Sequence, residues 1–142
     1  MKMRIWGVVC VALIATGVAA GQTNAAVQSN QDAAWVGTWH AELDGQPSAV
    51  LTLAEDNGAL EGTLVLNGIS RGGGQPHIAV RETHVLMHPR LDGRTLSFQV
   101  KRIKASSPLM SFTVDLTAQG SARLHCLNCG EDAPVVEMAK ED

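Results

Sequence analysis

Two cysteines stand out in this chain, because their spacing is one that proteins use for disulfides, metal sites and redox centres. Cys126 and Cys129 have the Cys-x-x-Cys spacing that serves as a disulfide, as half of a zinc site or as a redox centre in different proteins. We expect a disulfide, because residues 121–126 and 135–140 on either side alternate in polarity as strands do. The bond would then staple the turn between the last two strands, and we expect no cofactor.

Two alternatives stay open for this cysteine pair. His125 could join Cys126 and Cys129 as a metal ligand, although the second cysteine pair that completes a zinc ribbon is missing. Redox catalysis needs a helix N-terminus that stabilises a thiolate, whereas Glu131 and Asp132 follow here.

The remaining reactive residues do not converge on a reaction. In an extended chain His84 and His88 stand about 13 Å apart, too far for one ion, so we expect His77, His84 and His88 at the surface or lining the barrel mouth. The Gly-x-Ser-x-Gly match at residues 68–72 precedes two glycines and Pro76, which cannot begin the helix that a nucleophile elbow needs. We therefore expect a protein that is not an enzyme.

A small basic cluster follows one predicted strand. Lys101, Arg102 and Lys104 lie within four residues. Lysines on a solvated strand edge discourage pairing with other sheets, which is the interpretation we favour. A site for an anionic ligand headgroup near the barrel mouth is the alternative.

The beginning of the chain has the layout of a secretory signal. A cationic start ending at Arg4 precedes residues 5–20, an uncharged apolar run that is shorter than a membrane span. We predict cleavage after Ala20, or as late as Ala26, and a secreted or periplasmic protein without a stable membrane anchor. Residues 21–34 would form a flexible leader and residues 35–142 one β domain.

Length and charge exclude several classes of protein. The 142 residues suffice for one ordinary domain, and 45% hydrophobic content is too high for a disordered chain. Removing Lys2 and Arg4 with the signal leaves 9 basic against 14 acidic residues, a net charge of −5. Phosphate backbones repel such a surface, so we expect no nucleic-acid partner.

From Trp35 onward, apolar and polar residues alternate between turn signals such as Asp56-Asn57-Gly58. Short connections favour a meander, and the lack of a helix to cover an edge favours an antiparallel, eight-stranded up-and-down barrel. An open curved sheet or a β-sandwich is the alternative. The predicted strands are residues 35–43, 48–55, 59–66, 77–87, 94–102, 109–117, 121–126 and 135–140.

One stretch resembles known barrel families. Gly37-Thr38-Trp39 and the hairpins that follow, over residues 35–66, resemble the opening of an avidin-like barrel, and the Gly-x-Trp is also similar to the first lipocalin motif. The resemblance implies that Trp39 plugs one barrel end with Arg123 packed over it. Ala41 stands where avidins have a hydrogen-bonding asparagine, and the chain lacks tyrosine, so biotin is not the expected ligand.

Together these features predict a binding protein that takes a small apolar ligand in the barrel cavity. A solid barrel that acts as a structural or protein-interaction module is the alternative, because eight strands can be filled by their own side chains. The predicted cavity wall comes from inward-facing positions: Trp39, Leu51, Leu53, Phe98, Phe112 and Val114.

Overall fold

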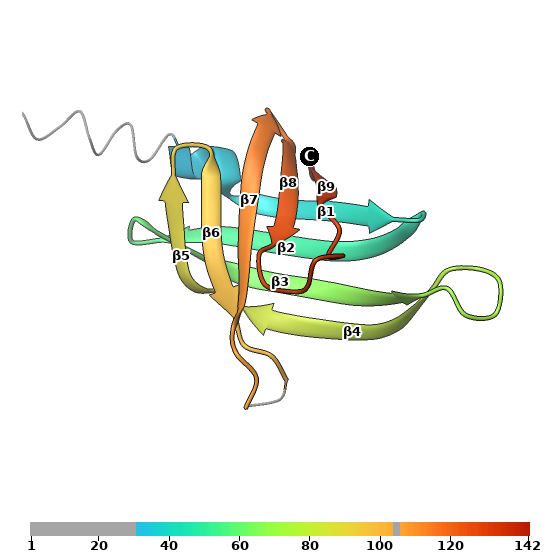
Figure 1. Cartoon of the computed structure of the whole chain (residues 1–142). Helices are drawn as coiled ribbons and strands as arrows, with labels where there is room; N and C mark the ends of the chain where they lie inside the picture. The colour runs from blue at the N-terminus through green and yellow to red at the C-terminus, as the bar shows by residue number, and fades with distance from the viewer. Residues whose placement is uncertain (1–30, 104–105) are drawn as a thin grey trace, which may run out of the picture.

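The computed structural model describes residues 31–103 and 106–142, and the predicted signal, most of the leader and Lys104 lie outside these ranges. Nine strands form one antiparallel sheet in the order β4-β3-β2-β1-β9-β8-β7-β6-β5 (Figure 1). The strands are β1 (Gly37–Leu43), β2 (Gln46–Asp56), β3 (Ala59–Ser70), β4 (His77–Val85), β5 (Met87–Asp92), β6 (Thr95–Val100), β7 (Met110–Ala118), β8 (Ser121–Cys126) and β9 (Val136–Lys140).

The strand order is that of an up-and-down barrel with one open seam. Consecutive strands pair from β1 to β4 and again from β5 to β9, and β9 pairs with β1 in a register that sets Lys140 opposite Trp39. Strands β4 and β5 are the two unpaired edges of this sheet. Figure 1 shows β1 to β4 running across the view and β5 to β8 running upright in front of β2 and β3. The predicted all-β, antiparallel meander is confirmed. The sheet forms an open barrel, because β4 and β5 do not pair with each other.

The structure has nine strands instead of the predicted eight, because residues 87–92, most of which were expected to connect two strands, form β5. Pro89 and the turn residues Asp92 and Gly93 mark a loop in sequence. Proline is tolerated in an edge strand, however, because its missing N–H faces away from the ladder. His88 adopts a φ of 50°, and the ladder between β5 and β6 shifts register between Met87 and Arg90. A single residue, Leu86, separates β5 from β4.

The predicted hairpin at Asp56-Asn57-Gly58 is confirmed. Asn57 and Gly58 have φ values of 52° and 80°, the left-handed conformations that a two-residue hairpin turn requires. The turn sets Asp56 opposite Ala59 and fixes the register of β2 against β3.

The alternation of apolar residues assigns the inner face correctly. In β6 Leu96, Phe98 and Val100 are buried, and in β7 Phe112 and Val114 are buried. Phe98 lies opposite Phe112, and their rings stack with centroids 5.6 Å apart. These side chains join those of the other strands in one continuous core.

One end of the barrel is covered by a short helix that sequence did not predict. Residues 31–35 are helical, including the last four residues assigned to the leader, and Val36 N–H donates to the Asp32 carbonyl at 3.1 Å. Trp35 is 1% exposed, so its burial anchors this segment against the barrel.

Candidate functional site

The helix-covered end of the barrel is closed by two tryptophans. Trp39 is fully buried, and its indole Nε1–H donates to the Trp35 carbonyl at 2.9 Å. The two rings lie 5.9 Å apart. Lys140 Nζ stands 5.8 Å from the centre of the Trp39 ring and donates to the Ala34 carbonyl. These contacts close the barrel interior at this end.

Lys140, and not Arg123, lies over the Trp39 ring. The expectation that Arg123 packs over Trp39 was wrong. Arg123 is exposed and donates from Nε to Glu137 at 2.6 Å. In β8 the inward positions belong to Ala122 and Leu124, so the intervening Arg123 faces solvent. Lys140 ends β9 beside Trp39, which is why it takes that place.

The six predicted cavity residues all face inward. Each is 3% exposed or less and belongs to the core. One of them, Phe112, also lines a hollow at the open end of the barrel. Whether a ligand touches them stays a prediction. Trp39, Leu51, Leu53, Phe98 and Val114 fill the interior between that hollow and the closed end.

The hollow at the open end, which we call the disulfide-end hollow, has a volume of about 200 Å³. Its wall is mostly apolar and includes both cysteines. Cys129 and Pro134 are exposed, so the hollow opens to solvent beside them. It is lined by Leu43, Ser48, Ala49, Leu66, Asn67, Phe112, Leu124, Cys126, Cys129, Ala133, Pro134 and Val136.

Ser48 supplies a free hydroxyl in this apolar wall. It is 8% exposed, and its Oγ has no hydrogen-bond partner. It sits at a bulge, because Ala41 pairs with Ala49 while Glu42 pairs with Pro47. A buried hydroxyl without a partner costs free energy, which a ligand with a hydrogen-bonding group would recover. Sequence offered no signal for Ser48, because the bulge alone turns it inward.

Asn67, the other polar residue of the wall, has its hydrogen bonds within the protein. Its side-chain Nδ2 donates to the Pro47 carbonyl at 2.9 Å, and its Oδ1 accepts from Arg81 at 3.1 Å. Asn67 therefore holds β3 against the start of β2 instead of offering a free group. This leaves Ser48 as the polar group of the described wall that a ligand can pair with.

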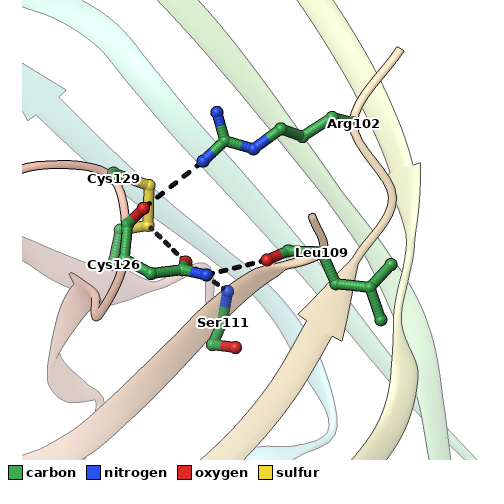
Figure 2. The surroundings of a disulfide bond; sticks show 6 residues. Arg102, Leu109, Ser111, Cys126 and Cys129 are labelled. Carbon is green, nitrogen blue, oxygen red and sulfur yellow. Dashed lines mark hydrogen bonds between the residues drawn. A yellow bond between two sulfur atoms is a disulfide. The ribbon is translucent and has the colours of Figure 1, made fainter. Parts of the chain in front are cut away.

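Cys126 and Cys129 form the predicted disulfide, with Cα atoms 5.6 Å apart (Figure 2). The sulfurs are bonded to each other, so neither is a thiolate ligand as the weaker metal alternative with His125 requires. Among residues 31–103 and 106–142, no group of three or more His, Cys, Asp or Glu side chains could hold a metal ion.

Asn128, between the two cysteines, fixes the disulfide loop to β7. Its side-chain Nδ2 donates to the Leu109 carbonyl at 2.8 Å, and its Oδ1 accepts from Ser111 N–H at 2.9 Å. Its backbone carbonyl accepts from Arg102 at 3.3 Å. Figure 2 shows Arg102, Leu109 and Ser111 gathered around the disulfide. The Asn128 side chain thus makes hydrogen bonds to the backbone of residues 109 and 111, as a neighbouring strand would. The residue type alone could not indicate this role.

The expectation of surface or mouth-lining histidines holds for His77 and His88, which are exposed, and was wrong for His84. His84 is 6% exposed, and its Nδ1 donates to the Lys101 carbonyl at 2.9 Å. Its Nε2 lies 3.3 Å from a Glu82 carboxylate oxygen without hydrogen-bond geometry. His84 faces inward like Leu86 and joins β4 to the residue after β6, across the open seam.

A larger groove of about 830 Å³ lies outside the closed end of the barrel. Trp35 lines it, and so do turn residues and the polar side chains of Arg94, Gln119 and Lys140. The buried tryptophan pair closes the barrel interior at this end. None of the six predicted cavity residues lines this groove, and only Phe112 lines the disulfide-end hollow.

No family model, curated protein or solved structure matches this chain. The avidin-like and lipocalin-like resemblance of residues 35–66 therefore stays a hypothesis. Within the part of the chain that the structure describes, no helix is long and apolar enough to cross a membrane.

Proposed function

We propose that this protein is a secreted or periplasmic binding protein, and that its ligand is a small neutral apolar molecule held in the disulfide-end hollow. The observation that carries the proposal is an apolar hollow that contains one buried hydroxyl without a partner, that of Ser48. Apolar walls supply affinity, and a single polar group orients the ligand. The predicted signal and the disulfide both support an oxidising compartment.

The volume limits the size of the ligand. A dry apolar cavity of about 150 Å³ holds one benzene molecule. A hollow of about 200 Å³ therefore suits one aromatic ring with one or two small substituents. A hydroxyl or amine on that ring would pair with Ser48 Oγ.

Mass spectrometry of the exported protein, under native and then denaturing conditions, tests the proposal. We expect a small additional mass that is lost on denaturation. The variant A49L fills the hollow from an inward position on β2 and should abolish that mass. The variant A54L adds the same side chain at an exposed position of the same strand and should retain it. A bare protein in all three samples would contradict the proposal.

A second candidate is a structural or protein-interaction module with no ligand. It is favoured by the filled interior, where Trp39, Leu51 and Val114 are fully buried. This alternative predicts a bare native mass and a stable complex with another protein chain.

A further inference from the structure

The open seam between β4 and β5 carries a second concave site, separate from the disulfide-end hollow. It is a cleft of about 450 Å³, within the roughly 300 to 1,000 Å³ typical of small-molecule sites. We call it the seam cleft, and it lies where the end of β4 approaches the segment after β6. Its lining residues are Thr83, His84, Val85, Met87, Lys101 and Ile103.

The seam cleft is open to solvent, and half of its lining residues, Val85, Met87 and Ile103, are apolar. Val85 is 70% exposed and Ile103 is 74% exposed, the two highest values among the large apolar side chains of the described residues. They come from different segments, 18 positions apart in sequence, and line one cleft. Because both side chains line one cleft, a ligand bound there would cover them together.

The electrostatics of the seam cleft favour an anion. Lys101 contributes an ammonium group, and none of the described lining residues is acidic. The hydrogen bond from His84 Nδ1 to the Lys101 carbonyl fixes the backbone of Lys101 against β4. Glu82, the nearest acid to the His84 ring, lies 3.3 Å from Nε2, and its side chain is 31% exposed.

We propose that the seam cleft binds a free organic anion with a single unbranched apolar chain. The chain lies against Val85, Met87 and Ile103, and the carboxylate pairs with the Lys101 ammonium group. Binding would cover the two most exposed apolar side chains without burying an acid beside them.

Two other occupants fit these observations less well. A second copy pairing antiparallel along the whole of β4 would set Arg81 opposite Arg81, and like charges in that position are destabilising. Recognition of an anionic bilayer generally relies on a cluster of about four to eight cations. The described lining of the seam cleft contains one lysine and is concave.

The test is a titration with sodium decanoate, kept below its micelle concentration, and with the neutral analogue decanol. NMR of labelled methyl groups locates binding, and calorimetry measures affinity. We expect decanoate to shift the methyl signals of Val85, Met87 and Ile103. The variant K101M should weaken decanoate binding about two- to fivefold and leave decanol binding unchanged. The control R90M replaces an exposed arginine of β5 outside the cleft and should change neither.

Two further variants separate this proposal from the one for the disulfide-end hollow. I103S should weaken both probes, whereas L127S, at a 57% exposed leucine of the disulfide loop, should not. A49L, which fills the hollow, should bind decanoate normally. Circular dichroism verifies that each variant is folded.

Four results would each overturn the proposal. They are shifts confined to Leu66 and Leu124 of the hollow, no shifts at millimolar decanoate, equal affinity of the wild type for decanoate and decanol, and binding to phosphatidylglycerol vesicles alone.

Discussion

Among single residues, Ser48 is the one at which the proposed function predicts opposite effects on stability and on ligand binding. Its Oγ is buried in an apolar wall without a partner. Replacing it with alanine removes an unpaired polar group, so S48A should raise the free energy of unfolding by about 1 kcal/mol. The same change should weaken the binding of hydroxylated ring compounds. Urea denaturation and a ligand titration on the same sample measure both effects, and a loss of stability would show that Ser48 has an essential partner in the fold.

The Asn128 side chain holds the disulfide loop against the start of β7. The change N128D keeps the oxygen that accepts from Ser111 N–H and removes the donor to the Leu109 carbonyl. Because Asn128 is exposed, we expect a cost of about 1 kcal/mol in the free energy of unfolding. Amide hydrogen exchange should speed up at the start of β7. Exchange that stays unchanged there would mean that this contact does not hold the disulfide loop.

At the scale of elements, the disulfide encloses a short loop and forms part of the wall of the hollow. Replacing Cys126 and Cys129 together with serine should lower the free energy of unfolding by about 2 kcal/mol, the chain-entropy value for so short a loop. Binding should weaken and persist, because ten of the twelve residues that line the hollow are not cysteines. Denaturation and ligand titration of the double variant test this. Complete loss of binding in a folded variant would mean that the disulfide itself is the main contact.

The stacked pair on β6 and β7 offers a matched comparison. Phe98 and Phe112 are 2% and 3% exposed, and only Phe112 is among the residues that line the hollow. F98A and F112A should each cost about 3 kcal/mol, since both leave a cavity in the core. F112A alone should admit a larger ligand, which a titration with naphthol and phenol would reveal. The same selectivity in both variants would place the ligand elsewhere.

For the whole molecule, local patterns predicted the architecture and only part of the wall of the disulfide-end hollow, namely Phe112, Cys126 and Cys129. Alternation in residues 95–100 and 110–116, with turn signals such as Asn57-Gly58, was enough for an all-β meander. Sequence did not predict β5 because it contains Pro89. Proline is excluded from central strands and tolerated in edge strands, and only the order in which the strands pair shows that β5 is an edge. Ser48 and His84 were missed because a bulge and an open seam, both products of distant pairing, set their surroundings.

We propose that the disulfide-end hollow binds a small neutral ring compound through Ser48. The most direct measurement is a methyl NMR titration with phenol and with toluene, which share the ring and differ in the hydroxyl. We predict that phenol shifts the signals of Leu43, Leu66 and Leu124 around the hollow and binds more tightly than toluene. S48A should remove this preference. If neither compound shifts these signals at millimolar concentration, the hollow does not bind such a ligand.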